Sequence, residues 1–352
     1  MPLASLCLGA PRAHCLAPPP FHHHPGAAQE IAWQARYPNY PAQPANRTPA
    51  ASGPEYAAML GALVPALRAA DPTLTLLAVF ADGAFNAGWL GAAGVAPYVG
   101  AASVHIGYAD SDAGGSPASA ASATAQAKAP QRVVLGALAA ARAGLDGGAG
   151  GGGHVRVSLD EWGLGPPWAV RQFNTAHALF GASFLTMALS SAEAFGVQFT
   201  NYFEPINEGA VRVLQFSAGP TPLGALMPLF GSLAGATRLG VAASGGGGGN
   251  SDDDVVALAA LAAGAPAPAP QSLVLLLTNR NATAGYTQWA QFQGQAVAAV
   301  ASVELLQATG GFSEGSFFVR SGAPVPVTGD GWVAVALPPF SVARVTVGCL
   351  SC

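Results

Sequence analysis

The feature that most constrains this sequence is a series of three apolar segments that each end on polar and aromatic side chains. They are residues 103–108 (SVHIGY), 155–163 (VRVSLDEWG) and 198–207 (QFTNYFEPIN). Between the second and the third, residues 174–193 place apolar side chains at helical spacing. Strand, helix, strand and helix in alternation are typical of a parallel sheet or a β/α barrel.

The middle segment reads as a strand that delivers carboxylates to its end. Residues 155–159 alternate between apolar (Val, Val, Leu) and polar (Arg, Ser) side chains, and the Gly/Pro-rich residues 163–167 predict where the strand stops. Asp160 and Glu161 come at this end. In a β/α barrel, catalytic groups gather at the C-terminal ends of the strands. An acidic pair that caps a following helix is the structural alternative, and it stays open.

Taken in this order, the segments resemble the retaining arabinofuranosidases of glycoside hydrolase family 51. These enzymes carry their nucleophile in a D-E-W motif on barrel strand seven, an H-x-Y-type strand end before it and an Asn-containing strand after it. The resemblance runs from Glu30 to the C-terminus. It implies a β/α barrel followed by an antiparallel β-sandwich, a retaining mechanism, and no metal or organic cofactor.

The resemblance also assigns roles to individual residues. Glu161 takes the position of the nucleophile, and Tyr108 the position of the tyrosine that orients it. Asp160 is expected to accept hydrogen bonds from nearby loops. Trp162 is expected beside the sugar, or alternatively in the core. The expected substrate-binding residues are His105, Tyr108, Trp162, Asn201, Glu204 and Asn207.

The acid/base residue departs from the family pattern. A retaining glycosidase needs two carboxyl groups about 5–5.5 Å apart. Residues 30–37 match the stretch that should carry the acid/base, but they read Ala-Trp-Gln where the family has Gly-Asn-Glu, so Gln34 takes the acid/base position. An amide cannot donate a proton as a carboxylic acid does. Glu204 and Glu208 are the alternative carboxylates, and a catalytic role for either stays open.

The predicted elements suggest a partial barrel. We expect strands near residues 74–80, 102–106, 155–160 and 197–202, and helices over 55–70, 125–145, 174–195 and 224–234. With a fragment near Glu30 this makes about five strands, whereas a barrel has eight. We therefore expect an N-terminally truncated barrel. The expected domains are a disordered region (1–29), the partial barrel (30–240), a Gly/Asp/Ala/Pro-rich insertion (241–270) and a β-sandwich (271–352).

In about the last 80 residues the spacing of apolar side chains changes from helical to alternating. Four alternating runs, 272–278, 301–306, 331–337 and 341–347, have no helical stretch between them, which favours an antiparallel sandwich. About seven strands make up such a sandwich, so we expect it to recruit a strand from the preceding region. Residues 337–342 (LPPFSV) also resemble the last hairpin of the family's sandwich.

Composition excludes several classes of partner. Charged residues make up 9% of the 352 residues and the net charge is −4, so no basic patch indicates nucleic acid or a membrane surface. No apolar run reaches the 18 residues of a transmembrane helix. Composition therefore favours a neutral molecule as the partner, and the resemblance implies a carbohydrate, an arabinose-containing glycan or glycoside.

The sequence does not determine the cellular compartment of the protein. Sequons at Asn46 and Asn281 are compatible with secretion, but the N-terminus lacks the positive region of a signal peptide. Cys349 and Cys352 have the spacing of a local disulfide.

Three interpretations follow. The first is an α-L-arabinofuranosidase-like enzyme, inactive as written if Gln34 holds the acid/base position. The second is a catalytically dead relative that binds carbohydrate. The third is a glycosidase of a neighbouring barrel family that acts on another sugar.

Overall fold

The computed structural model describes residues 49–79, 90, 99–105, 119–146, 154–162, 174–200, 214–215, 219–241, 254–262, 271–293, 296–312 and 318–350. The chain forms two compact units. One comprises Met1–His105 and Leu138–Leu159, and the other Ile106–Ala137 and Asp160–Cys352. In the described residues no helix is long and apolar enough to cross a bilayer.

The first unit is built from predicted elements. Helix α2 (Pro49–Ala70) leads into β1 (Leu76–Val79), which pairs in parallel with β2 (Val99–His105). Arg68, in the last turn of α2, donates to the carbonyl oxygen of Leu74 at 2.8 Å, so a basic side chain satisfies the backbone where the helix gives way to the strand. The C-terminal part of helix α4 (Ala120–Asp146) completes the unit together with most of β3 (Arg156–Glu161).

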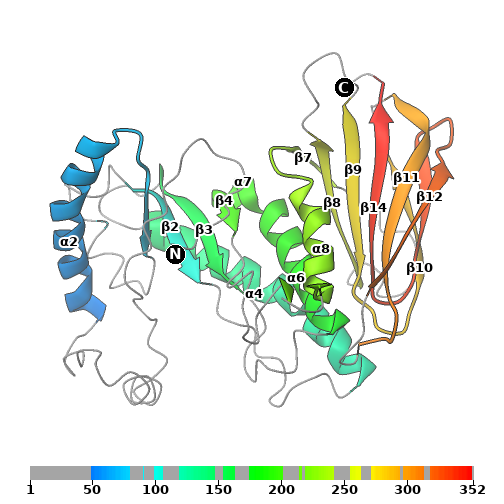
Figure 1. The fold of residues 1–352 in the computed structure, drawn as a ribbon, viewed down its shortest axis with the longest axis horizontal. Coiled ribbons are helices and arrows are strands. Elements are labelled where there is room, and N and C mark those ends of the chain that lie inside the picture. The colour runs from blue at the N-terminus through cyan, green and yellow to red at the C-terminus, as the bar shows by residue number, and fades with distance from the viewer. Residues whose placement is uncertain are drawn as a thin grey trace. The chain divides into compact units, whose positions relative to one another are not determined.

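The parallel pairing of β1 with β2 agrees with the alternation of strands and helices in the sequence. A four-stranded sheet has the order β1-β2-β3-β4, in which β4 is Val197–Thr200. Figure 1 labels β2 and β3 of this sheet. Four strands in this order form an open sheet, and the described residues do not form a closed barrel. The observed fold class is therefore mixed α/β.

The second unit contains the most buried helix. Helix α6 (Thr175–Ser190) begins at Asn174, whose side-chain oxygen accepts from the backbone N–H of His177 at 2.8 Å. The sequence predicts one helix over 174–195, but α6 ends at Ser190 and the short α7 (Ala192–Phe195) follows. Gly196 then ends the helical stretch in the left-handed conformation, with φ 68°. Helix α8 (Pro222–Gly231) packs against α6, and β5 (Leu214–Gln215) pairs with β6 (Gly219–Pro220).

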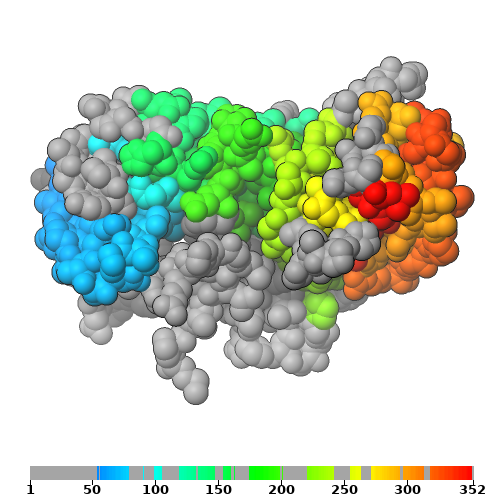
Figure 2. Space-filling model, turned by 90° about the horizontal axis from the view of Figure 1, so that it is seen from above, coloured from blue at the N-terminus to red at the C-terminus, as the bar shows by residue number. Residues whose placement is uncertain are grey.

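Two antiparallel sheets follow, and they share one core. The six-stranded sheet has the order β12-β11-β14-β9-β8-β7, and β10 pairs with β13 in a two-stranded ribbon. Figure 2 shows these strands as a continuous yellow-to-red body. The strands are β9 (Ser272–Asn279), β10 (Tyr286–Gln291), β11 (Val297–Ala308), β12 (Phe318–Pro326), β13 (Trp332–Leu337) and β14 (Ser341–Cys349). The four predicted strands and their antiparallel pairing are confirmed.

The expected recruitment of an earlier strand is also confirmed. Strands β7 (Thr237–Leu239) and β8 (Val255–Ala262) extend the sheet beyond β9. Strand β8 lies inside residues 241–270, which the sequence suggests are an insertion. Its eight residues pair along the whole of β9, so this stretch is part of the sheet.

The connection between β13 and β14 differs from the expected hairpin. The two strands belong to different sheets, because β13 pairs with β10 whereas β14 lies between β11 and β9. Residues 338–340 therefore cross from one sheet to the other. Phe340 is buried there with φ 46°, and its N–H donates to the carbonyl of Asn281 at 2.9 Å. A buried side chain and this hydrogen bond hold the strained backbone.

The first prediction concerns the shared core. Val345, at the centre of β14, is fully buried between β11 and β9. Val345→Ala should lower the free energy of unfolding by about 1.5–3 kcal/mol, because it removes two buried methyl groups and leaves a cavity. Val319→Ala on β12 is the matched control, since Val319 is 55% exposed and loses the same β-branched side chain. Urea unfolding that gives equal losses for both variants would contradict the assigned core.

Candidate functional site

Strand β3 carries the carboxylates that the sequence singles out. Val155, Val157, Ser158 and Leu159 are all fully buried, so from Val157 the strand is covered on both faces, as strands of a parallel sheet usually are. Arg142 from α4 donates to the carbonyl of Val155 at 2.9 Å and holds the backbone just before the strand. Glu161 is the last residue of the strand. The prediction that a strand ends on this carboxylate is confirmed for the backbone.

Trp162 follows immediately and is buried. Its indole ring is 2% exposed and stacks on Phe184 of α6, with ring centroids 4.2 Å apart and an interplanar angle of 12°. Gly181, one turn before Phe184, leaves space for Leu223 of α8: a Cβ there would lie 2.5 Å from a methyl of Leu223, and 3.6 Å, an ordinary contact distance, from the indole. Trp162 thus anchors the end of β3 to α6. Its expected contact with a sugar stays a prediction.

The other predicted site residues are placed only in part or not at all. His105 is the last residue of β2, which is the strand next to β3 in the sheet. The side chains of His105, Asp160 and Glu161 lie outside the description. The residues wholly outside the described ranges are Gln34, Tyr108, Asn201, Glu204, Asn207 and Glu208. The structure therefore leaves their mutual distances, and the separation of any carboxylate pair, as predictions.

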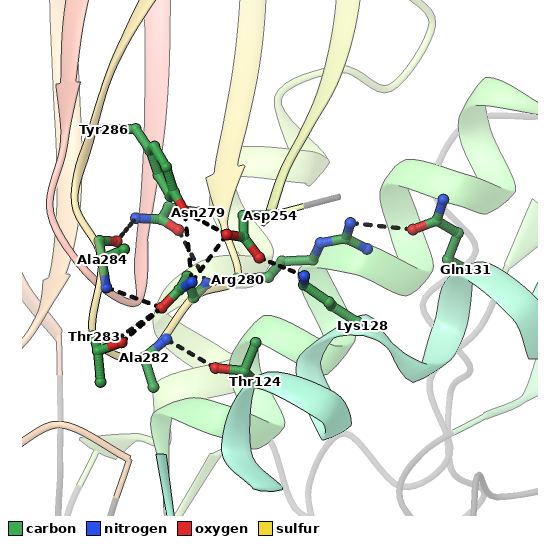
Figure 3. A network of polar contacts seen from close by, with 11 residues as sticks. Thr124, Lys128, Gln131, Asp254, Asn279, Arg280, Ala282, Thr283, Ala284 and Tyr286 are labelled. Carbon is green, nitrogen blue, oxygen red and sulfur yellow. Dashed lines mark hydrogen bonds and ion pairs between the residues drawn. The ribbon is translucent and has the colours of Figure 1, made fainter. Parts of the chain in front are cut away.

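A second polar cluster, which the sequence did not predict, surrounds Asp254 (Figure 3). Asp254 is 5% exposed and precedes β8 directly. One carboxylate oxygen pairs with Lys128 of α4, while the other accepts from the Tyr286 hydroxyl and from the Asn281 amide, the latter at 2.9 Å. The sequence shows only a run of three aspartates at 252–254, and nothing in it distinguishes the third.

The turn between β9 and β10 is held by two asparagines of this cluster. Asn279 donates to the carbonyls of Ala284 and Pro338, both at 2.8 Å. The side-chain oxygen of Asn281 accepts from the backbone of Thr283 and Ala284, each at 2.9 Å. The amide nitrogen of Asn281, which carries the glycan when a sequon is modified, already donates one hydrogen to Asp254, so a glycan would have to replace the other hydrogen.

Further contacts join helix α4 to the same turn. The Thr124 hydroxyl accepts from the backbone N–H of Ala282 at 3.0 Å, and the fully buried Arg280 donates to the Gln131 side chain at 3.1 Å. All of these residues belong to the second unit.

The electrostatics of the cluster favour an ionised Asp254. Burial raises the pKa of its carboxyl, but the hydrogen bonds from Lys128, Tyr286 and Asn281 outweigh this and leave the pKa below its usual value. The pKa of Tyr286 is raised, chiefly because its hydroxyl donates to Asp254. Since both carboxylate oxygens of Asp254 are paired or hydrogen-bonded, we interpret the cluster as one that stabilises the fold. The described residues contain no group of three or more His, Cys, Asp or Glu that could hold a metal ion.

Comparison of the sequence with protein-family profiles and with curated proteins finds no match. Solved structures do resemble this one. An α-L-arabinofuranosidase from Thermotoga maritima, solved as its arabinose complex, superposes with a TM-score of 0.62 at 14% identity, over 88% of this chain and 64% of that one. A GH51 arabinofuranosidase from Xanthomonas axonopodis pv. citri gives a TM-score of 0.59 at 17% identity, over 83% and 62%.

A glycoside hydrolase family 44 xyloglucanase from Paenibacillus polymyxa is also similar, with a TM-score of 0.56 at 11% identity, over 84% of this chain and 61% of that chain. The chain thus spans less than two thirds of each of these three structures. At such low identity the likeness establishes a shared fold, and it does not choose between the families of hydrolase.

The packing at the end of β3 gives the second prediction. Gly181→Ala should lower the free energy of unfolding by about 1 kcal/mol, because displacing the Leu223 methyl in a filled core costs more than the gain of about 0.5–1 kcal/mol that alanine brings through helix propensity. Gly136→Ala in α4 is the matched control. A Cβ at Gly136 meets nothing within 4 Å, so this change should stabilise by about 0.5–1 kcal/mol through helix propensity. Thermal unfolding of both variants checks the pair, and a stabilising Gly181→Ala would contradict the described packing.

The Asp254 cluster gives the third prediction. Asp254→Asn should lower the free energy of unfolding by about 1.5–3 kcal/mol at neutral pH, since hydrogen bonds to a charged group are lost. A lowered carboxyl pKa contributes stability above the unfolded value of about 3.9, and this is lost as pH falls toward the folded pKa. The difference in the free energy of unfolding between the wild type and Asp254→Asn should therefore become smaller below about pH 4.

Asp146→Asn is the control for this experiment. Asp146 forms an i,i+4 pair with Arg142 and its side chain is 55% exposed, so its loss should cost less than about 0.5 kcal/mol. Denaturant titrations from pH 3 to pH 7 measure both variants. A gap for Asp254→Asn that does not change with pH would show that its charge does not stabilise the fold.

Proposed function

We propose that this protein is a glycoside hydrolase of the retaining, α-L-arabinofuranosidase-like kind, with Glu161 as its nucleophile. The observation that carries the proposal is the end of β3: Glu161 is the last strand residue, and the next residue, Trp162, is fixed in the core by Phe184. The fold likeness to glycoside hydrolases supports it. The architecture that goes with the proposal is a partial β/α barrel followed by a β-sandwich.

The proposed chemistry uses a covalent intermediate. The Glu161 carboxylate attacks the anomeric carbon as the bond to the leaving oxygen breaks, and water then hydrolyses the glycosyl-enzyme. A nucleophile must be held in one geometry to gain from proximity. A strand end joined to a buried, stacked indole provides such a rigid support. In this proposal His105, Tyr108, Asn201, Glu204 and Asn207 contact the sugar from neighbouring strand ends.

Gln34 limits what the chain can do as written. Protonation of the leaving oxygen is worth about 10²–10⁴-fold, and an amide at the acid/base position forfeits it. Natural polysaccharides have poor leaving groups and need this proton. Aryl glycosides have good leaving groups and need it far less. The proposed enzyme is therefore weak or inactive on polymers unless Glu204 or Glu208 supplies the proton.

Gln34 also favours a second candidate function, a catalytically dead relative that binds carbohydrate. A protein of this kind would retain ligand without turnover. The two candidates differ in whether a glycosyl-enzyme forms at Glu161.

The fourth prediction tests the nucleophile. The wild-type chain should release phenol slowly from an activated aryl α-L-arabinofuranoside, and Glu161→Ala should reduce release to the uncatalysed rate. Arabinan should not be hydrolysed measurably. Gln34→Glu should raise the rate on arabino-oligosaccharides by about 10²-fold or more, because it restores the proton donor.

Glu193→Gln is the control, since its exposed carboxylate only pairs with Arg238. Intact-protein mass spectrometry during turnover should detect a chain heavier by one pentosyl unit, absent from Glu161→Ala. Sugar binding without release or adduct would favour the binding protein. Efficient hydrolysis of arabinan by the wild type would disprove the assignment of Gln34.

A further inference from the structure

The outward face of the β10–β13 ribbon carries an exposed tryptophan. Trp289 is 57% exposed, whereas Trp162 is 2% exposed. In the ribbon register Trp289 lies opposite Ala334, and Gln291 lies opposite Trp332. Positions two apart on a strand share a face, so Trp289, Gln291, Trp332 and Ala334 all lie on the outer side. The inner side is formed by Val333, Val335 and Leu337, which belong to the shared core.

The outer face is uncharged and centred on an aromatic ring. Its residues are Thr287, Trp289, Gln291, Trp332, Ala334 and Ala336, and none is charged. Ala334 opposite Trp289 has no side chain long enough to cover the indole. An aromatic plate of this kind offers a large rigid contact area at little cost in conformational entropy.

A polar group is already oriented beside the plate. The Gln291 amide nitrogen donates to the carbonyl of Asp330 at 3.1 Å, and its oxygen accepts from Gln293 at 3.1 Å. A side-chain amide has two donor hydrogens and two acceptor lone pairs, so the contacts with described residues leave one of each for a ligand. A hydroxyl group, which donates and accepts at once, matches that remaining pair.

The size of the face argues against a protein partner. Six residue pairs make a ribbon about 20 Å long and about 10 Å wide, or about 200 Å². A stable dimer needs about 800 Å² from each partner. A few sugar rings fit the smaller area, and their C–H faces and hydroxyls are the groups that an indole and an amide recognise.

We propose that the outer face of the β10–β13 ribbon binds a neutral polysaccharide chain, with Trp289 as the stacking platform and Gln291 as a hydrogen-bonding partner. This surface is separate from the end of β3. It would hold the polymer whether or not Glu161 acts on it, so it stands independently of the proposed catalytic function.

Retention on polysaccharide tests the proposal. Native gels of the full chain are cast with soluble neutral polymers: arabinan, arabinoxylan and xyloglucan. We expect at least one polymer to slow the wild type, and Trp289→Ala to weaken that binding at least tenfold. Trp289→Phe should keep part of it, because a ring remains. Val319→Ala, which removes a similarly exposed apolar side chain from β12, should bind as the wild type does.

Two further measurements make the result decisive. Trp289→Ala should leave the melting temperature unchanged within about 2 °C. It should also leave the rate of hydrolysis of a small aryl glycoside unchanged, which would separate this face from the proposed catalytic residue. Sedimentation of the wild type and of Trp289→Ala reports association of copies. Equal retention of both proteins, no retention by any polymer, or a wild-type dimer that Trp289→Ala dissociates would each overturn the proposal.

Discussion

Neutralisation of the buried Asp254 carboxylate is the constraint on which the arrangement of the second unit depends. An unpaired carboxylate at 5% exposure would cost several kcal/mol in lost hydration. Its partners come from three different segments: Lys128 from α4, Asn281 from the turn after β9, and Tyr286 from β10. One charge can be buried only when all three segments are in place, so a single desolvated group links a helix, a turn and a strand. The identities of these side chains therefore add to hydrophobic burial in specifying how the helix, the turn and the strand meet.

The local sequence predicts those elements whose pattern matches their environment. β3 and β14 were predicted because alternating apolar residues face a core. β8 was not, because Val255–Ala262 is rich in alanine and lies between a Gly/Asp tract and an Ala/Pro tract, so its local propensity carries no strand signal. Its conformation comes from pairing with all eight residues of β9, a partner that only the folded chain supplies. The sequence also does not predict the pairing of β13 with β10, because adjacency along the chain favours a hairpin between β13 and β14.

In the candidate site, too, local features are predictable from the sequence and long-range contacts are not. A motif and a strand end suffice to predict the backbone position of Glu161, since both are local properties. The support beneath it is not local. Trp162 stacks on Phe184 of α6, and position 181 of the same helix is a glycine that lets Leu223 of α8 pack closely beside it. Likewise, the run of three aspartates does not reveal that Asp254 meets Lys128, more than 100 residues away along the chain. Long-range partners of this kind depend on the tertiary fold.

Trp162 and Trp289 show why residue type alone does not define a binding surface. Both follow strand-like sequence, and both would be read as core aromatics or as sugar platforms with equal justification. Burial separates them: Trp162 ends a strand covered on both faces and faces a helix with a glycine at the contact, whereas Trp289 stands on the outer side of a ribbon opposite an alanine. The indole of Trp162, which contacts Phe184 and lies beside Gly181, is already buried in the folded protein. The indole of Trp289 keeps more than half of its area in water, and the outer-face residues around it include the Gln291 amide and no charged side chain. The difference in environment makes the first ring part of the core and leaves the second exposed for the ligand that we propose.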